Sequence, residues 1–324
     1  MTSPTTLDPN PFHPDSVTDE TRRVTDQFAE LLASQPRIHE VDPVVTRAAR
    51  AEGRSWAGPI VKLDQAQTRT VPGPAGDVPL RVLIPDHVDG VYLHLHGGGW
   101  VLGQADQQDE MLWDTACAAN LAVVSVEYRL APEHPYPAGP DDCEAAALWL
   151  AQNAQQEFGA DRLTIGGESA GGHLAAATLL RMRDRHGYSG FRGANLVYGA
   201  YDLSLTPSGR TSPDALLIPT DTMRWFASHF VPDESMLRDP DVSPLFADLR
   251  DMPPALFSVG TADPLLDDSL FMHQRWLAAG NVAELAVYPG GIHGFNRLPM
   301  AVARQANDRA HEFLRAATSD EIAD

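Results

Sequence analysis

The sequence of 324 residues has little positive charge for its size. Its 24 lysines and arginines stand against 44 aspartates and glutamates, which gives a formal net charge of −20 at neutral pH. Lysine is almost absent, since Lys62 is the only one and arginine supplies the rest. A chain with this balance is poorly suited to neutralise phosphates or to bind an anionic membrane surface. Nucleic acid is therefore not expected among its partners.

Cysteines and long apolar runs are also scarce. Cys117 and Cys143 are the only cysteines, and both fall in segments with helical patterning, so neither a disulfide framework nor a cysteine-rich metal site is expected. No apolar run approaches the roughly 18 residues needed to span a bilayer. Residues 1–12 lack the basic and apolar regions of a secretory signal. These absences predict a soluble cytoplasmic protein without a membrane span.

Hydrophobic residues make up 43% of the chain, which is enough for a sizeable core. Short apolar segments, which predict strands, occur at residues 65–71, 78–84, 91–95, 121–126, 163–165, 194–198, 255–259 and 283–288. Helical periodicity is found at residues 109–119, 142–154, 170–185 and 266–279, and Asp141 and Glu144 have the spacing of a capping box. This alternation predicts an α/β fold, with a hairpin opening one mostly parallel sheet that helices cover on both faces.

Two parts of the chain lie outside this alternation. Residues 17–35 and 41–52 have helical spacing before the first strand, and they predict an N-terminal helical segment over residues 1–55. Residues 201–240 interrupt the later strands with a polar loop and an aromatic-rich helix, and they predict an insertion above the sheet. The main domain is therefore expected over residues 56–324, with this insertion inside it.

The strongest local motif is Gly-Glu-Ser-Ala-Gly at residues 167–171, between a predicted strand and a predicted helix. A serine on such a sharp turn exposes its hydroxyl at the carboxyl end of the sheet, and the turn tolerates only small neighbours such as Gly167 and Gly171. The turn also lies at a helix N-terminus, where the Ala170 amide can face a developing negative charge. A glycine-rich turn with an incidental serine is the alternative, but the flanking strand and helix favour Ser169 as a nucleophile.

Three successive glycines follow the predicted strand at residues 91–95. Their amides carry no obstructing side chain, so we assign Gly98 and Gly99, together with Ala170, as donors of an oxyanion hole. The neighbouring His94 and His96 could form a metal pair, but no further ligands with suitable spacing accompany them. We expect His94 to be structural and His96 to order the glycine loop through hydrogen bonds.

A nucleophilic serine needs a base, and the base needs an orienting carboxylate. Asp263 and His293 each follow a predicted strand through a short loop, at the edge of the sheet where Ser169 is also expected. The predicted catalytic residues are therefore Ser169, His293 and Asp263. Asp267 and Asp268 follow the same strand as Asp263, but they lie one turn into a predicted helix, so Asp263 is better placed. For His173 we expect a packing or hydrogen-bonding role.

Five segments combine these motifs in one order. They are His-Gly-Gly-Gly at 96–99, Tyr-Arg-Leu-Ala-Pro-Glu-His-Pro at 128–135, Gly-Glu-Ser-Ala-Gly-Gly at 167–172, Asp-Pro-Leu at 263–265 and His-Gly-Phe at 293–295. The set resembles the hormone-sensitive-lipase-like esterases of the α/β-hydrolase fold, also called bacterial family IV esterases, from about residue 60 to the C-terminus. One departure is Glu168, where relatives commonly carry aspartate. The resemblance implies an eight-stranded sheet, a helical cap over the site and cofactor-free hydrolysis of carboxylic esters.

The expected activity is hydrolysis of short-chain acyl or aryl esters through an acyl-enzyme intermediate. An amidase or carbamate hydrolase would use the same three residues. A non-catalytic receptor of this fold, as in the plant gibberellin receptors, would lack the catalytic histidine, whereas His293 is retained here. We expect a small-molecule ester as the partner, without cofactor or metal, and the family leaves a homodimer open. Trp225, Phe226 and Phe230 could line the substrate pocket, although core packing or a dimer contact would also explain them.

Overall fold

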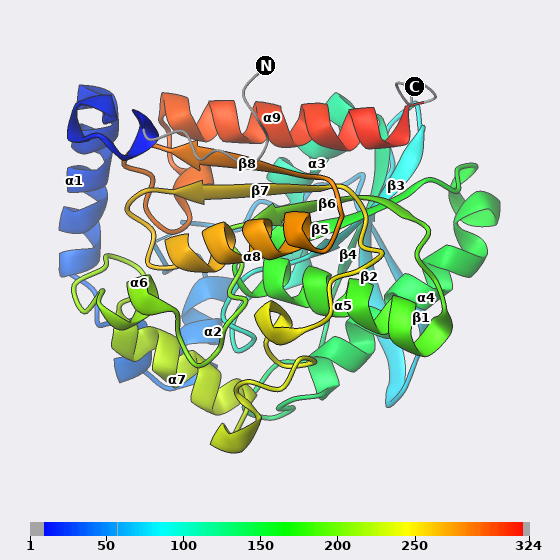
Figure 1. Cartoon of the computed structure of the whole chain (residues 1–324), viewed down its shortest axis with the longest axis horizontal. Coiled ribbons are helices and arrows are strands. Elements are labelled where there is room, and N and C mark those ends of the chain that lie inside the picture. The colour runs from blue at the N-terminus through cyan, green and yellow to red at the C-terminus, as the bar shows by residue number, and fades with distance from the viewer. Residues whose placement is uncertain (1–9, 57, 320–324) are drawn as a thin grey trace.

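Eight strands form one sheet in the order β1-β2-β4-β3-β5-β6-β7-β8 (Figure 1). The computed structural model describes residues 10–56 and 58–319. The strands are β1 Gln67–Gly73, β2 Gly76–Leu83, β3 Gly90–Leu95, β4 Leu121–Val126, β5 Leu163–Glu168, β6 Phe191–Val197, β7 Ala255–Gly260 and β8 Ala283–Tyr288. Strand β2 runs antiparallel to both β1 and β4, and the remaining neighbours are parallel. The predicted α/β fold, with a hairpin opening a mostly parallel sheet, is confirmed.

Strand β5 continues three residues beyond its predicted end, through Gly166 and Gly167 to Glu168. These residues give no apolar signal in the sequence, yet all six residues of β5 are buried. A Cβ atom at Gly166 would overlap the carbonyl oxygen of Asn195 on the neighbouring strand β6. Glycine is therefore present because β5 and β6 approach closely, and the sequence pattern ends before the strand does.

Helices cover both faces of the sheet (Figure 1). On one face lie α3 Asp109–Ala119 and α9 Ala301–Thr318; on the other lie α4 Ala138–Phe158, α5 Ala170–His186 and α8 Leu266–Ala278. Helix α9 has no predicted counterpart in the sequence. Its buried residues include Val302, Ala303, Ala306 and Leu314, so much of its buried side consists of small residues. These residues recur at helical spacing along one face, so the sequence does contain a helical pattern here, which the prediction overlooks.

The remaining helices lie near the carboxyl ends of the parallel strands, at the left of Figure 1. They are α1 Asp19–Ala33, α2 Pro43–Ala51, α6 Pro207–Arg210 and α7 Thr220–Phe230. Short 3₁₀ helices are η1 Asn10–Phe12, η2 Pro14–Ser16, η3 Ile38–Glu40, η4 Ala105–Gln108, η5 Glu234–Met236, η6 Pro244–Phe246 and η7 Phe295–Arg297. The N-terminal segment and the 201–240 region touch, since His39 Nδ1 lies 2.7 Å from the Thr222 hydroxyl oxygen. Among the described residues, no helix has the length and apolar character to cross a membrane.

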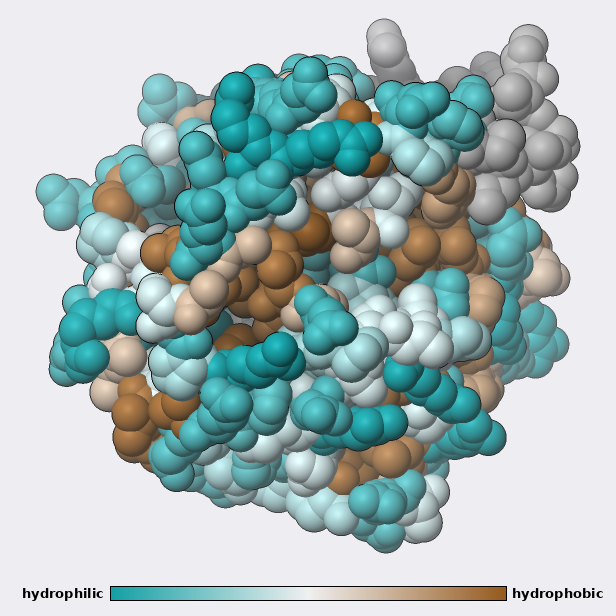
Figure 2. All heavy atoms as spheres, turned by 90° about the vertical axis from the view of Figure 1, so that its left-hand side faces the viewer, coloured by the Kyte–Doolittle hydropathy of each residue, from teal (hydrophilic) through white to brown (hydrophobic). Residues whose placement is uncertain are grey.

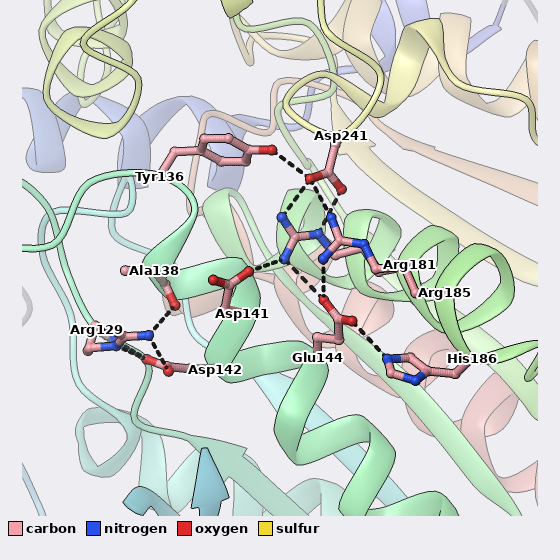
Figure 3. A network of polar contacts seen from close by, with 10 residues as sticks. All are labelled: Arg129, Tyr136, Ala138, Asp141, Asp142, Glu144, Arg181, Arg185, His186 and Asp241. Atoms are coloured by element: carbon pink, nitrogen blue, oxygen red, sulfur yellow. Dashed lines mark hydrogen bonds and ion pairs between the residues drawn. The ribbon is translucent and has the colours of Figure 1, made fainter. Parts of the chain in front are cut away.

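The predicted capping box of Asp141 and Glu144 is wrong. Helix α4 begins at Ala138, after Pro137, so both acidic residues lie inside the helix. They face the neighbouring helix α5 instead, where Arg181 donates to an Asp141 oxygen at 2.8 Å and a Glu144 oxygen at 3.3 Å (Figure 3). The spacing of a capping box also occurs one turn into a helix, where the same residues are free to form ion pairs.

Arg181 is the centre of a polar network between α4, α5 and the segment that follows η5 (Figure 3). Its side chain is only 2% exposed. Besides its two partners on α4, it donates to the two oxygens of Asp241 at 2.7 and 2.6 Å. The Tyr136 hydroxyl donates to Asp241 at 2.6 Å. A buried guanidinium with three carboxylate partners ties α5, the helix that begins next to Ser169, to its surroundings.

Arg181→Met is expected to lower the free energy of unfolding by about 3 kcal/mol at pH 7. Methionine would fill part of the volume, but it would remove the buried cation shared by Asp141, Glu144 and Asp241. The more exposed Arg185 would remain beside Glu144 and Asp241 only. Urea denaturation of the variant and the wild type measures the difference. The matched control is Arg224→Met, because Arg224 and its partner Asp221 are 62% and 73% exposed. We expect that control to change stability by at most about 0.5 kcal/mol.

The effect of Arg181→Met should depend on pH. Burial opposes ionisation of Asp241, but hydrogen bonds from Arg181 and Tyr136 outweigh it and lower the pKa of Asp241 below its ordinary value. A carboxylate with a lowered folded pKa stabilises the fold above its unfolded pKa, and this stabilisation is lost as the pH falls through the folded pKa. The stability difference should therefore shrink below about pH 4. A difference that stays constant to pH 3 would contradict an ionic role for Asp241.

Candidate active site

Ser169 lies on the sharp turn between β5 and α5. Its backbone angles of φ 58° and ψ −118° belong to a region that residues other than glycine rarely adopt. A Cβ atom at Gly167 or Gly171 would overlap the carbonyl oxygen of Leu95 on β3, so only glycine allows the turn to pack this closely. The turn holds the Ser169 side chain at the carboxyl edge of the sheet, where it lines a cavity.

Three predicted residues from separate segments meet at this edge. His293 Nε2 lies 2.9 Å from Ser169 Oγ. On the other side of the ring, His293 Nδ1 lies 2.9 Å from Asp263 Oδ2 and 3.1 Å from Oδ1. The Leu265 amide donates to Asp263 Oδ1 at 2.8 Å, which fixes the carboxylate. These contacts favour the tautomer with a proton on Nδ1, facing Asp263, and a lone pair on Nε2, facing the serine.

The other carboxylates after β7 have different partners. Asp268 accepts hydrogen bonds from the amides of Tyr201 at 2.7 Å and Asp202 at 2.9 Å, and from the Thr206 hydroxyl at 2.6 Å. Burial raises the pKa of Asp268 to about 7, against the effect of these donors. Asp267 accepts from the Ser208 amide at 2.8 Å. Both side chains therefore bind the 201–208 segment.

The amides predicted for an oxyanion hole lie next to Ser169. Gly98 has φ 128° and Gly99 has φ 62°, so both adopt conformations that favour glycine. Within residues 10–56 and 58–319, the amides of Gly98, Gly99 and Ala170 have no backbone acceptor. A Cβ atom at Gly99 would overlap the ring of Phe226 from α7, so the helix packs directly on the glycine loop.

His173 supports this loop from α5. Its Nδ1 accepts a hydrogen bond from Trp100 Nε1 at 2.9 Å, and its Nε2 lies 2.8 Å from the Val242 carbonyl oxygen. Burial lowers the pKa of His173 to about 4, so the ring is neutral at pH 7 and donates to Val242. The expected hydrogen-bonding role of His173 is confirmed. Its partner Trp100, which follows Gly99, could not be identified from the sequence.

His94 and Glu168 form a buried pair beneath the site. Glu168 Oε2 lies 3.1 Å from His94 Nε2 and accepts from Gln108 Nε2 at 3.3 Å. His94 Nδ1 lies 2.9 Å from Ser125 Oγ on β4. Burial alone would raise the pKa of Glu168, but His94 and the hydrogen bonds outweigh burial and lower it. Glutamate at this position thus contacts the adjacent strand β3, in agreement with a structural role for His94.

His96 is stacked on Tyr128, with ring centroids 4.1 Å apart, and its Nδ1 lies 2.9 Å from the Gly97 carbonyl oxygen. This contact fits the predicted role of His96 in ordering the loop. The Tyr128 hydroxyl donates to the His96 carbonyl oxygen at 2.7 Å, which fixes the start of the loop. In the described part of the chain, no group of three or more histidine, cysteine, aspartate or glutamate side chains could hold a metal ion.

Two cavities meet at Ser169. The first, which we call the histidine cavity, is lined by Gly97 to Gly99, Glu168, Tyr198 and His293, and on its outer side by Arg50, Trp56 and Arg297. The second, which we call the apolar cavity, is lined chiefly by Leu203, Leu205, Met223, Phe226 and Leu265. Figure 2 shows this edge of the molecule from outside, where apolar side chains gather in patches between polar ones.

Of the three aromatic residues considered for the substrate pocket, the core or a dimer contact, Phe226 lines both cavities. Phe230 is instead buried against Trp100, with stacked ring centroids 4.7 Å apart. Trp225 packs on His229 of its own helix, at 4.5 Å between ring centroids. Helical spacing alone does not separate these environments, because a helix turns neighbouring aromatics toward different faces.

Comparison with known proteins agrees with this architecture. A family model described as alpha/beta hydrolase fold matches residues 92–297. The carboxylic ester hydrolase LipN of Mycobacterium tuberculosis is 34% identical over 293 residues, which cover 84% of this chain and 77% of LipN. The carboxylesterase NlhH of the same organism is 37% identical over 260 residues, 74% of this chain and 79% of NlhH. A solved hyperthermophilic esterase from Pyrobaculum calidifontis has a TM-score of 0.83 at 30% identity, covering 92% and 98% of the two chains.

Proposed function

Since the chain belongs to the hormone-sensitive-lipase-like carboxylesterases of the α/β-hydrolase fold, we propose that it hydrolyses short-chain acyl or aryl esters. The residues proposed to carry out the reaction are Ser169, His293 and Asp263. Membership makes the chain an ester hydrolase and not the receptor considered as an alternative. The observation that carries the proposed roles is the unbroken series of contacts from the Ser169 hydroxyl through the imidazole to the Asp263 carboxylate, with both His293 contacts at 2.9 Å. Acyl transfer by these groups requires no cofactor.

The proposed reaction has two acyl-transfer steps. His293 Nε2 takes the Ser169 proton as the oxygen attacks the ester carbonyl, and Asp263 stabilises the imidazolium that forms. The amides of Gly98, Gly99 and Ala170 bind the oxyanion, for which they have no competing backbone acceptor. The imidazolium then protonates the leaving alcohol. Water, activated by the neutral histidine, attacks the acyl-enzyme and releases the acid and the free serine.

The two cavities suggest where each half of the ester binds. The leaving alcohol oxygen must reach His293 Nε2, and His293 lines the histidine cavity. We therefore place the alcohol portion there and the acyl chain in the apolar cavity. Leu203, Leu205, Met223 and Leu265 are each at most 8% exposed, so the acyl chain would run toward the interior. An interior site favours short acyl chains, because a long chain has no room to extend.

We also propose that the N-terminal segment through residue 55 and the 201–240 insertion together cap the site. The proposal is supported by Arg50 and Ile218, which come from these two segments and line the histidine cavity. Residues 1–9 of the proposed cap lie outside the described residues. The cytoplasmic location and the homodimer stay predictions.

A chain-length series tests the substrate class. We expect kcat/KM for p-nitrophenyl esters to be greatest between acetate and hexanoate and to fall at least a hundredfold, or by about 3 kcal/mol, toward palmitate. The matched aryl amide of the preferred acid should turn over far more slowly than the ester. A flat series or a preference for palmitate would contradict the interior acyl site, and equal turnover of amide and ester would favour the amidase alternative.

Covalent labelling tests the nucleophile independently of turnover. A p-nitrophenyl alkylphosphonate, which resembles the tetrahedral intermediate, should release one equivalent of p-nitrophenol and leave the phosphonyl group on Ser169. Peptide mass spectrometry locates the label. Labelling of a different residue, or turnover that persists in fully labelled protein, would contradict the assignment of Ser169.

A further inference from the structure

Two arginines from distant parts of the sequence line the histidine cavity. Arg50 comes from the last turn of α2, and Arg297 ends η7, four residues after His293. Arg50 is half-buried, whereas Arg297 is exposed at the outer side of the same cavity. The Arg297 guanidinium lies over the ring of Trp56, 5.5 Å from its centroid. Two cations therefore face the space that also contains Ser169 and His293.

Neither guanidinium has a salt-bridge partner among the described residues. Other arginines do form salt bridges. Arg47, one turn before Arg50, donates to Glu133 at 2.7 Å. Arg129 pairs with the buried carboxylate of Asp142 at 2.8 Å. The chain carries 44 acidic residues against 24 basic ones, so carboxylates are abundant. Within the described ranges, Arg50 and Arg297 thus lack the carboxylate partner that Arg47 and Arg129 have.

The surroundings of Arg50 leave its charge uncompensated. Burial, and to a smaller extent the charge of Arg297, lower the pKa of Arg50 to about 10, and no carboxylate acts in the opposite direction. At pH 7 Arg50 is still a cation. Glu168 lines the same cavity, but its carboxylate is already bonded to His94 and Gln108. A buried cation beside a second cation is costly unless an anion joins them.

We propose that the histidine cavity binds a carboxylate that is part of the ester substrate, with Arg50 and Arg297 as its ligands. The inference rests on the proposed function, because it concerns the same cavity and the same reaction. Guanidinium groups match the planar, two-oxygen geometry of a carboxylate. The surplus of 20 negative charges on the whole chain would repel an anionic substrate, and a local pair of cations offsets that repulsion at the site.

The carboxylate is expected on the alcohol half of the ester, because that half is placed in the histidine cavity. The test has a second arm, in which the acyl group carries the charge instead. Carboxymethyl butyrate against propyl butyrate places the charge on the alcohol, and monoethyl succinate against ethyl valerate places it on the acyl group. Proton release in a pH-stat measures kcat and KM for each ester. The proteins compared are the wild type, Arg50→Gln, Arg297→Gln, the double variant, Arg50→Lys and the control Arg192→Gln. Arg192 is exposed near the amino end of β6, away from the site.

In the wild type, we expect the carboxylate ester of the alcohol arm to have a kcat/KM at least tenfold above its neutral counterpart. The double variant should lose that preference through a tenfold to hundredfold rise in KM, because hydrogen bonds to a charged group have this strength. Arg50→Lys should keep part of the preference, and Arg192→Gln should keep all of it. The arm that responds identifies the half of the ester that carries the charge.

If the wild type hydrolyses neutral esters with no carboxylate preference in either arm, or if the double variant keeps the preference, the inference is overturned while the proposed function stands. If no ester is hydrolysed at all, the proposed function itself fails. A melting temperature within about 3 °C of the wild type shows that each variant is folded. Should Arg50→Gln be unstable, Arg297→Gln decides alone, because Arg297 is exposed.

Discussion

Ser169→Ala is expected to lower kcat for a short-chain p-nitrophenyl ester by about 10⁵- to 10⁶-fold, the size of effect found when a nucleophile of this kind is removed. Its Oγ atom, 2.9 Å from His293 Nε2, is the group that would form the acyl-enzyme. Without it, ester hydrolysis would depend on water in the oxyanion hole, and phosphonate labelling should disappear. Stopped assays over hours are needed to measure so slow a reaction.

The fold should survive this change, because alanine has nearly the same shape and the same backbone limits as serine. A melting temperature within about 3 °C of the wild type would show this. Ser228→Ala is a matched control: Ser228 is exposed on α7, and its hydroxyl donates to the Trp225 carbonyl oxygen of the same helix. Its kcat should change less than twofold. Equal rates for Ser169→Ala and the wild type would refute the proposed nucleophile.

Asp263→Asn is expected to lower kcat by about 10⁴-fold with little change in KM. The reason lies in the hydrogen bonds of this carboxylate. Oδ1 accepts from the Leu265 amide at 2.8 Å, so the asparagine oxygen should occupy that position and direct its NH₂ group at His293. His293 Nδ1 would then accept a hydrogen bond, which moves the ring proton to Nε2. In that tautomer the imidazole cannot take the Ser169 proton.

Asp267→Asn is the control for this prediction, because Asp267 follows the same strand but accepts from the Ser208 amide. Its kcat should stay within about threefold of the wild type. Steady-state kinetics at pH 7 and the rate of phosphonate labelling provide two separate measurements, and both should fall in Asp263→Asn. A larger loss in Asp267→Asn than in Asp263→Asn would reassign the orienting carboxylate.

The sequence predicts much of this fold because central strands are buried on both faces. Strand β4, which lies inside the sheet with all six residues buried, begins and ends where its apolar run does, at residues 121–126. The edge strand β8 is only partly buried, and it also spans its predicted range of 283–288. The pattern fails where burial is achieved by other means. Glycines extend β5 beyond its apolar part, where the sequence has no hydrophobic period. Helix α9 is a different case, because its buried residues Val302, Ala303 and Ala306 do recur at helical spacing and the prediction overlooks them.

The residues of the site also fall into those that the sequence predicts and those that it does not. The predicted catalytic residues lie just after strands and near glycines: Ser169, Asp263 and His293. Local motifs and the geometry of a parallel sheet therefore predict that they lie close together. Arg50 and Arg297 have no such signal. Each is an ordinary arginine in a helical segment, and only the three-dimensional arrangement places both in the histidine cavity. Residues that recognise a substrate are thus harder to predict than residues that perform the chemistry.

The contact between His173 and Trp100 has a further consequence. Helix α5 starts beside the nucleophile, and through His173 it also fixes the tryptophan that follows the glycine loop. The attacking oxygen and the amides proposed to stabilise its product are therefore anchored to one rigid body. Arg50, Phe226 and Met223 belong to α2 and α7, outside that body. Substrate preference can accordingly be re-engineered in those two helices while the spacing of the reacting groups is preserved.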